Sequence, residues 1–261
     1  MVTRDTRWPA GTPCWVELSV PDVPKAAAFY QALFGWDVRS AIPSPDGYAI
    51  AHLRDRIVAA ISPVTSPQDV PASWMTYLAA DEADPVAEKI TAAGGQLTVG
   101  PLDVGEEGRM AVAVDPAGVE FGLWQGGRTT GIGLANEAGA LTWNEHLSWE
   151  FDASKAFYRA VFGYGFQDVS EGSFRYAVLQ VDAREVGGIG QWPDGTPPGT
   201  PAAWSVYFAV ADTDAAVTAV TGLGGSVIAP VRDSPYGRMG VVADNQGAVF
   251  CLISSPEVVR L

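Results

Sequence analysis

Cysteine and histidine are scarce in this chain of 261 residues, which holds two of each. Cys14 and Cys251 lie at opposite ends of the sequence, too few and too far apart to predict a disulfide framework or a metal cluster. With only His52 and His146 present, a metal site of ordinary composition would have to depend on carboxylates. We therefore expect two reduced thiols in a cytosolic protein.

Positive charge is also in short supply, because 16 Lys and Arg face 30 Asp and Glu and the formal net charge is −14. Such a chain gains no affinity for phosphate backbones and is repelled by anionic lipid, so neither nucleic acid nor membrane is an expected partner. No run approaches the roughly 18 apolar residues of a spanning helix, and the polar residues 1–13 contain no signal-peptide core. We expect a soluble, cytoplasmic protein.

Several motifs of nucleotide-binding proteins and hydrolases are missing as well. No G-x-G-x-x-G opens a helix after a strand, and neither a P-loop nor a G-x-S-x-G elbow occurs. Nucleotide binding and serine hydrolase chemistry therefore lack support. What the chain does contain is 48% apolar residues with 29 Gly and 19 Pro, which is typical of a globular protein with many turns.

An internal repeat runs through the whole sequence. Residues 29–36 (FYQALFGW) recur as residues 157–164 (FYRAVFGY), with five of eight positions identical at an offset of 128. Offsets of 129 and 130 continue the same register into the later part of each half, as small loop insertions would produce. A duplicated domain explains this register, so we predict domains at residues 1–130 and 136–261.

Each half contains two similar units in which an alternating, strand-like pattern gives way to a helical one. In the first unit the apolar residues within 26–33 share one helical face, with Asp22 as a predicted N-cap and Gly35 past the end. Further helices are predicted at about 84–93 and 214–223, each followed by a Gly-Gly pair. Because β-rich runs follow the helices, we expect four βαβββ modules, at about residues 10–62, 72–125, 140–191 and 202–255.

These patterns resemble the vicinal oxygen chelate superfamily, which includes glyoxalase I, the bleomycin-resistance proteins and the extradiol dioxygenases. The resemblance rests on the strand leading to residues 20–22 (VPD), the helix end at 29–35, and the late strand entry at 115–121 (DPAGVEF). The second half matches with residues 157–163 and 244–250 (DNQGAVF). The tandem layout looks most like two-domain glyoxalase-like proteins of actinobacterial type. The resemblance implies an α+β fold of two tandem glyoxalase-like domains, each of two βαβββ modules forming a half-open barrel around a cleft.

The resemblance also implies where a metal would bind, and there the chain departs from the family. Metal-dependent members carry His or Gln on the first strand of each module and Glu near the end of the last strand. The matching first-strand positions hold tryptophan, whose indole has no lone pair for a metal: Trp15, Trp74, Trp143 and Trp204. The matching last-strand positions fall near Ala60, Gly122, Gly188 and Cys251. We expect no family-type metal and no cofactor.

The four tryptophans allow two interpretations. Each can simply fill one end of a small barrel, since an aromatic side chain buries roughly 150–250 Å². Alternatively, the four face the clefts, where flat indole rings suit a planar, apolar ligand.

Two glutamates share the strand parity of the tryptophans that precede them. Glu17 and Glu145 are thus expected to lie deeper on the cleft side of each half. An apolar cleft raises the pKa of a carboxyl, which suits a ligand anchor or an acid-base catalyst. A structural ion pair with Arg109 or Arg238, which occupy equivalent places in the repeat, is the other interpretation.

Three further polar residues receive structural predictions. His146 stands where the first half has Leu18, on the parity that faces the helix, so we expect a core or interdomain histidine bonded to a neighbour. His52 has no histidine counterpart and is expected at a strand edge. Glu120 is one residue out of phase with the family's Glu position and should point into solvent.

Three functions remain open. In the first, a metal-independent protein binds a hydrophobic, partly planar small molecule in two pockets, lined by Trp15, Glu17, Trp74 and Arg109 and by Trp143, Glu145, Trp204 and Arg238. In the second, a lyase, isomerase or oxygenase acts on a small carbonyl or phenolic substrate, with Glu17 or Glu145 as the catalytic acid-base residue. In the third, a scaffold protein fills both clefts with its own side chains. The chain would act as a monomer of two pseudo-symmetric domains or as a homodimer.

Overall fold

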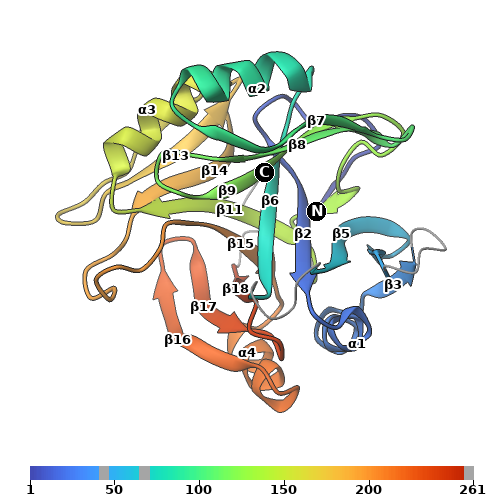
Figure 1. Cartoon of the computed structure of the whole chain (residues 1–261). Coiled ribbons are helices and arrows are strands. Elements are labelled where there is room, and N and C mark those ends of the chain that lie inside the picture. Colours follow the sequence, from blue (N-terminus) through green and yellow to red (C-terminus); the bar gives the residue numbers. More distant parts are fainter. Residues whose placement is uncertain (41–46, 65–70, 256–261) are drawn as a thin grey trace.

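The computed structural model describes residues 1–40, 47–64 and 71–255, which form two similar halves (Figure 1). Each half builds an eight-stranded sheet of its own, and each sheet carries two helices. The sheets are open, with β3 and β7 at the edges of the first and β12 and β16 at the edges of the second. The predicted α+β class with two tandem domains is confirmed.

The first sheet has the strand order β3-β4-β5-β2-β6-β9-β8-β7. Along the chain its strands are β2 (Pro13–Val20), β3 (Asp37–Ser40), β4 (Ala49–Leu53), β5 (Arg56–Pro63), β6 (Ser73–Ala79), β7 (Gln96–Val104), β8 (Gly108–Val114) and β9 (Glu120–Gly126). β2 and β6 run antiparallel at the centre, with β5 parallel to β2 and β9 parallel to β6. Two βαβββ modules are thus joined along their first strands.

The second sheet repeats this plan in the order β12-β13-β14-β11-β15-β18-β17-β16. Its strands are β11 (Leu141–Ser148), β12 (Gly165–Asp168), β13 (Tyr176–Val181), β14 (Arg184–Gln191), β15 (Ala203–Ala209), β16 (Ser226–Ser234), β17 (Gly237–Ala243) and β18 (Val249–Ser254). A short antiparallel pair ties the start of the chain to the segment between the domains: β1 (Val2–Thr3) and β10 (Leu134–Ala135).

One helix follows the first strand of each module: α1 (Val23–Phe34), α2 (Ala83–Ala92), α3 (Phe151–Phe162) and α4 (Thr213–Gly222). The Asp22 side chain accepts a hydrogen bond of 2.9 Å from the Lys25 amide and caps α1. Gly35 ends that helix in the left-handed conformation at φ 74°, which a residue without a β-carbon adopts at low cost. The helices expected at 84–93 and 214–223 begin and end within one residue of their predicted positions.

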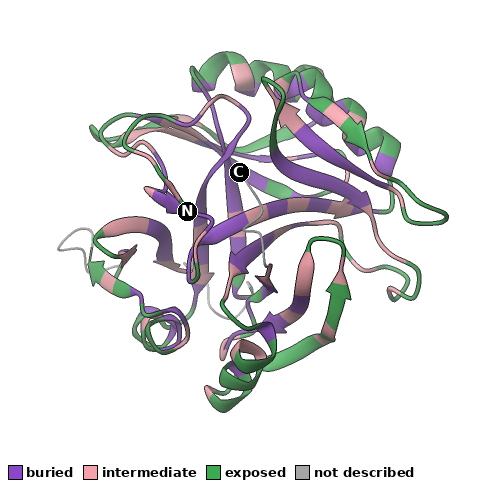
Figure 2. Ribbon diagram, turned by 180° about the vertical axis from the view of Figure 1, so that it is seen from behind, coloured by how far each residue is buried: buried purple, intermediate pink, exposed green. Residues whose placement is uncertain are grey.

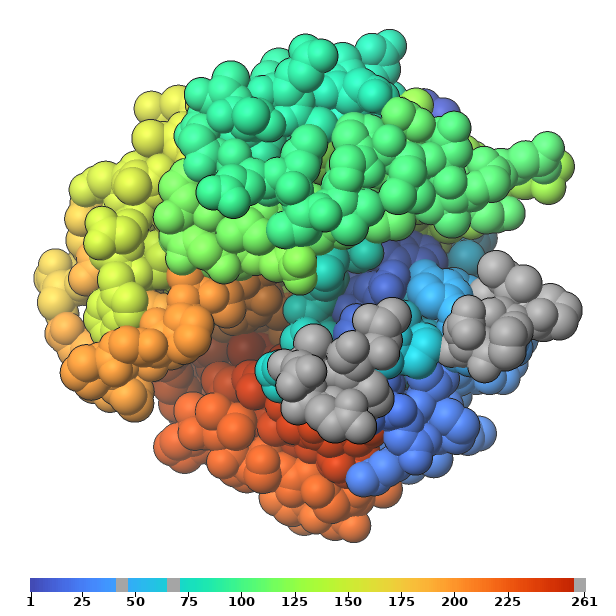
Figure 3. Space-filling model, in the orientation of Figure 1, coloured from blue at the N-terminus to red at the C-terminus, as the bar shows by residue number. Residues whose placement is uncertain are grey.

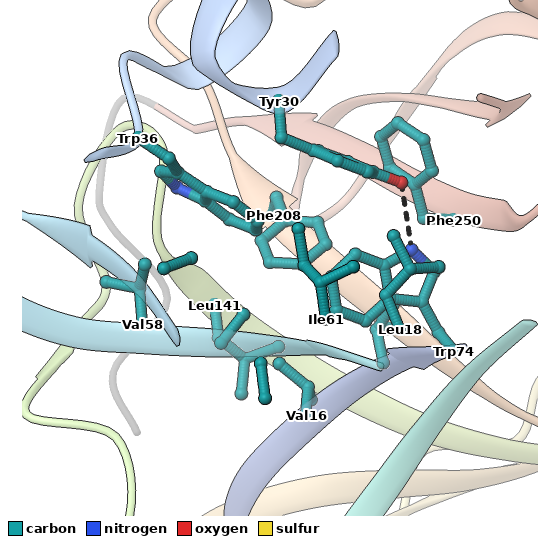
Figure 4. Packing of buried hydrophobic residues seen from close by; sticks show 14 of the residues in the cluster. Val16, Leu18, Tyr30, Trp36, Val58, Ile61, Trp74, Leu141, Phe208 and Phe250 are labelled. Carbon is teal, nitrogen blue, oxygen red and sulfur yellow. Dashed lines mark hydrogen bonds between the residues drawn. The ribbon is translucent and has the colours of Figure 1, made fainter. Parts of the chain in front are cut away.

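The two domains share their apolar core. Tyr30 of α1 lies with its ring centroid 5.7 Å from that of Phe250 in β18, and Trp36 lies 5.5 Å from Phe208 in β15 (Figure 4). α1 also packs against α4, and α2 packs against α3. The first module of each domain therefore packs against the second module of the other. Burial follows this arrangement, with buried residues in the central strands and exposed residues on the outer faces of the helices (Figure 2).

None of the helices in the described ranges is long and apolar enough to cross a membrane.

Candidate functional site

The pairing of β2 with β6 fixes which side chains face the first cleft. Trp15 lies opposite Tyr77, whereas Leu18 lies opposite Trp74. Because side chains alternate along a strand, Trp15, Glu17 and Tyr77 share one face of the sheet and Leu18 and Trp74 share the other. The Leu18 face packs against helices and the second domain. The Glu17 face thus points away from the other domain.

Aromatic side chains surround the glutamate of the first domain. Tyr48, just before β4, donates a hydrogen bond of 3.2 Å from its hydroxyl to Glu17 Oε2. Trp15 stacks on Trp124 of β9, with ring centroids 6.3 Å apart and planes 20° apart. We call Trp15, Glu17, Tyr48, Tyr77 and Trp124 the first cleft.

The second domain holds its glutamate more tightly. Tyr176 donates to Glu145 Oε2 at 2.8 Å, and the Tyr207 hydroxyl donates to Oε1. The indole N–H of Trp143 donates in turn to the Tyr176 hydroxyl at 3.0 Å. We call Trp143, Glu145, Tyr176 and Tyr207 the second cleft, in which a continuous hydrogen-bond chain leads to one carboxyl group.

Glycines make room for these tyrosines. Gly122 lies beside Tyr77, and a β-carbon at Gly122 would come within 2.0 Å of Tyr77 Cδ1. Gly188 lies beside Glu145, and a β-carbon there would come within 1.8 Å of the Tyr176 hydroxyl. Any side chain at either glycine, a carboxylate included, would displace the neighbouring tyrosine. Tyrosine thus fills the space beside each glutamate.

Burial raises the pKa of both glutamates above the ordinary value. At Glu145 the hydroxyls of Tyr207 and Tyr176 and the charge of Arg232 oppose this effect without cancelling it. Burial also raises the pKa of Tyr207, and the nearby acidic groups of Cys251 and Glu145 add to the increase. Each cleft therefore shifts its glutamate toward the neutral form relative to an exposed glutamate.

The residues present do not fit the divalent metal that the fold family suggests. No three His, Cys, Asp or Glu side chains of the described ranges come together around a point that could hold an ion. The strand neighbours of Tyr77 and Tyr207 are Gly122 and Cys251, and burial raises the pKa of the Cys251 thiol. Both oxygens of Glu145 already accept hydrogen bonds from tyrosine. A thiol, and a carboxyl whose oxygens already accept hydrogen bonds from tyrosine, are poor ligands for a hard cation.

The prediction that Trp74 and Trp204 line the clefts is wrong. Their indole N–H groups donate to the hydroxyls of Tyr30 and Tyr158, at 3.1 and 2.7 Å, on the face that carries the helices. Both indoles are buried in apolar clusters that the two domains share, and Figure 4 shows the cluster around Trp74. The error is one residue of register. On each of these strands the residue that faces the cleft is the tyrosine three positions after the tryptophan, Tyr77 or Tyr207.

Arg109 and Arg238 are likewise not partners of the glutamates. Arg109 forms ion pairs with Asp84 of α2 at 2.8 Å and with Asp103 at 2.8 Å. Arg238 makes the equivalent pairs with Asp214 of α4 and Asp233. Each arginine thus ties a helix to the edge of its sheet, on the side away from the cleft. The carboxylates Glu17 and Glu145 do lie on the cleft side, as predicted.

The interdomain histidine is confirmed. His146 Nε2 lies 2.8 Å from Asp115 Oδ2, and the hydroxyl of Tyr158 donates to the same oxygen at 3.0 Å. Asp115 belongs to the first domain and the other two residues to the second. Glu120 is exposed, as its strand phase predicted, and His52 lies on β4 near the edge of its sheet.

Several cleft residues escaped the sequence prediction. Tyr48 and Tyr176 were not among the predicted pocket residues, and the register error hid the tyrosines of β6 and β15. Trp124 was not predicted to line a pocket either, yet it stacks on Trp15 in the first cleft. The one available signal was that tyrosine recurs at matching offsets in both halves.

Tandem domains of paired βαβββ modules, each with a polar group at the centre of a half-open sheet, define a glyoxalase-like architecture. The family model of the Glyoxalase/Bleomycin resistance protein/Dioxygenase superfamily matches residues 14–123 and 150–252. The chain belongs to this superfamily.

Similar proteins occur in actinobacteria. The chain is 41% identical over 250 residues to "Putative glyoxylase CFP32" of Mycobacterium tuberculosis, covering 93% of this chain and 94% of that protein. It is 32% identical over 266 residues to "Anthracycline biosynthesis protein DnrV" of Streptomyces peucetius, covering 97% and 96%.

Solved structures share the fold at low sequence identity. A Mn(II)-bound glyoxalase from Novosphingobium aromaticivorans superimposes with a TM-score of 0.67 at 15% identity, covering 96% of this chain and 85% of that one. The 2,2',3-trihydroxybiphenyl 1,2-dioxygenase of Sphingomonas wittichii gives 0.63 at 14% identity, covering 96% and 92%.

Proposed function

We propose that the protein binds a hydrophobic, partly planar small molecule in its aromatic clefts without a family-type metal. The observation that carries the proposal is the kind of side chain that stands at the base of each cleft. Where a metal site would need several carboxylate or imidazole ligands, the chain has tyrosines, glycines and a single glutamate in each domain. Aromatic faces and a buried hydrogen-bonding group suit a flat ligand that carries hydroxyl or carbonyl groups.

One relative supports the same chemical class. A protein 32% identical to this chain is named for anthracycline biosynthesis, and anthracyclines are planar, polycyclic aromatic compounds. The predicted pocket residues Trp15 and Trp143 remain part of this proposal, together with Glu17 and Glu145.

Tryptophan fluorescence offers a direct test, with 1,4-dihydroxyanthraquinone as the probe. We expect saturable quenching that is unchanged after dialysis against EDTA, and Trp143→Phe should weaken the quenching. Elemental analysis of the purified protein should find no stoichiometric transition metal. About one metal ion per domain, lost on chelation together with binding, would contradict the proposal.

A second candidate is an enzyme of the same superfamily, a lyase, isomerase or oxygenase acting on a small carbonyl or phenolic substrate. It is favoured by the buried Glu145 carboxyl, whose raised pKa and tyrosine partners suit proton transfer. Small ketones and catechols incubated with the protein in D₂O and followed by NMR would reveal exchange or turnover. Activity that survives the double variant Glu17→Gln, Glu145→Gln would rule out these residues as the acid-base pair.

We further propose a cytoplasmic location and a monomer of two pseudo-symmetric domains, or a homodimer. Sedimentation of the full chain distinguishes the two assemblies.

A further inference from the structure

The mouth of the second cleft exposes aromatic rings, which is unusual for side chains of this size. Phe174 is 44% exposed and stacks on Tyr176, with ring centroids 5.5 Å apart and planes 10° apart. Tyr236, in the turn between β16 and β17, is 46% exposed, and its pKa is raised by partial burial and by the charges of Glu185 and Glu145. In Figure 3 the orange and red surface of the second domain is hollowed, with red residues of its last strands at the base. The aromatic wall of the second cleft thus continues to the surface.

An arginine lies at the same mouth. Arg232 of β16 is paired in register with Met239 of β17, and Met239 packs in one cluster with Tyr207 and Cys251. The Arg232 side chain is therefore on the cleft side of the sheet, and its positive charge acts on Glu145. No ion pair or hydrogen bond of Arg232 is found in the described part of the chain, whereas Arg109 and Arg238 are each paired with two aspartates.

The first domain lacks each of these features. The register partner of Met110 there is Leu102, so a leucine takes the place of the arginine. The residue before the turn glycine is Glu107 instead of tyrosine, and its carboxylate accepts a hydrogen bond of 2.6 Å from Thr129. The counterpart of Phe174 in the repeat is Asp46, which lies outside the described residues. The first cleft is aromatic, but leucine stands at the position of its edge strand that is equivalent to Arg232.

We propose that the second cleft is the ligand site of this protein, and that its ligand is a planar aromatic compound with an anionic oxygen held by Arg232. This inference rests on the function proposed above and adds the domain and the charge of the ligand. The protein carries a net charge of −14, so an anion is repelled from most of its surface and needs a local cation to bind. The ring would lie along Phe174 and Tyr236, and the guanidinium would pair with a carboxylate or phenolate at the mouth.

Two matched probes test this inference: anthraquinone-2-carboxylate and its neutral amide, titrated by calorimetry into the full chain. We expect one site per chain and a preference for the acid. Arg232→Leu, which copies Leu102 of the first domain, should weaken binding of the acid about tenfold and leave the amide within about twofold. Arg184→Leu, at an exposed arginine of β14, is the control for loss of one surface charge and should change neither value.

Further variants locate the site. Phe174→Ala should weaken both probes, whereas Leu97→Ala, at an exposed apolar residue of β7 in the first domain, should weaken neither. Equal affinity for acid and amide, or a loss with Leu97→Ala but not with Phe174→Ala, would overturn this inference and leave the proposed function standing. Failure of both probes to bind at millimolar concentration would overturn both the inference and the proposed function. Circular dichroism of each variant confirms that a loss of affinity is not a loss of fold.

Discussion

The two domains anchor each other through equivalent aspartates, but the two aspartates have different numbers of hydrogen-bond partners across the interface. In one, Asp244 accepts a hydrogen bond of 3.1 Å from Tyr30 across the interface. In the other, Asp115 accepts from Tyr158 and is also bonded to His146. Both aspartates additionally accept two backbone amides of their own turns. Duplication thus preserved a crosswise aspartate–tyrosine contact, to which the second domain adds a histidine.

In the clefts, too, the second domain has more hydrogen bonds than the first. Glu145 accepts from two tyrosines, whereas one tyrosine bond, from Tyr48, is found to Glu17 in the described part of the first domain. The second domain also carries the exposed aromatic rings at its cleft mouth and Arg232, for which no ion pair is found in the described part of the chain. The equivalent backbones of the two domains thus carry unequal polar groups, and the proposed ligand site in the second domain rests on this difference.

The largest expected effect comes from removing the interdomain aspartates. Asp115→Ala leaves Tyr158, His146 and two amides without their acceptor, and we expect a loss of about 3–5 kcal/mol in the free energy of unfolding. Asp244→Ala leaves one donor fewer without an acceptor than Asp115→Ala does, and the expected loss is about 2–3 kcal/mol. Urea denaturation of both variants measures the difference. Equal losses would show that His146 adds nothing to the second anchor.

Substitution of the cleft glycines should have the next largest effect on stability, and the size of the effect should differ between the two domains. Gly122→Ala places a methyl group against the ring of Tyr77, close to the backbone, while Gly188→Ala meets the hydroxyl of Tyr176, at the far end of a side chain that can rotate. We expect losses of about 1–3 kcal/mol, larger at Gly122. Gly100→Ala is the control, because no atom lies within 4 Å of its β-carbon. A larger loss at Gly188 would mean that the Tyr176 hydroxyl is fixed more firmly than the Tyr77 ring.

The sequence predicted the fold well because its signals are local and occur twice. The N-cap Asp22, the left-handed Gly35 and the repeated helix end each depend on a few neighbouring residues, and all three lie where the pattern placed them. The predicted βαβββ modules required the edge strands β7 and β16, but their bounds were not predicted, because residues 96–104 and 226–234 are mostly exposed and carry no clear alternation.

The candidate site was only half predictable, because it depends on register. A one-residue shift moves a side chain to the other face of a sheet, and this is what separated Trp74 from Tyr77. The partners of Arg109 lie on a helix and on the neighbouring strand, so its ion pairs follow from tertiary packing that spacing does not report. Glu17 was placed correctly because it sits two residues from Trp15 on one uninterrupted strand.

The glutamates predict how stability depends on pH. Their pKa values are raised above 4.5 in the folded chain, so the folded protein holds protons that the unfolded chain has lost. The free energy of unfolding should therefore fall as pH rises from about 4.5 through the folded pKa, by at most about 1.4 kcal/mol per pH unit for each carboxyl. Glu17→Gln and Glu145→Gln should each flatten this dependence.

Urea unfolding between pH 4 and 8 measures the slope for the wild type, both single variants and the double variant. The single variants show which domain contributes more. A double variant that keeps the full wild-type slope would place the responsible groups outside the clefts.

The smallest expected effect is that of His146→Leu, which gives the second domain the Leu18 of the first. His146 Nδ1 is buried without a hydrogen-bond partner in the described part of the chain, so the histidine brings both a bond to Asp115 and an unsatisfied nitrogen. These effects oppose each other, and the change in the free energy of unfolding at neutral pH should stay below about 1 kcal/mol.

The acid unfolding of His146→Leu should change more clearly. Asp115 has a lowered pKa despite its burial, chiefly through His146, and stability from a lowered pKa is present above 3.8 and is lost as pH falls through the folded value.

Without the histidine the lowering shrinks, so the midpoint of acid unfolding, followed by circular dichroism, should move to a higher pH. An unchanged midpoint would mean that the Tyr158 hydroxyl and the two amides of the turn hold Asp115 ionised by themselves. In that case the two anchors would be equivalent after all, since Asp244 is held by the same kinds of donor. A shifted midpoint with nearly unchanged stability at neutral pH would instead show that the histidine tunes the charge of the interface and that the tyrosines hold the domains together.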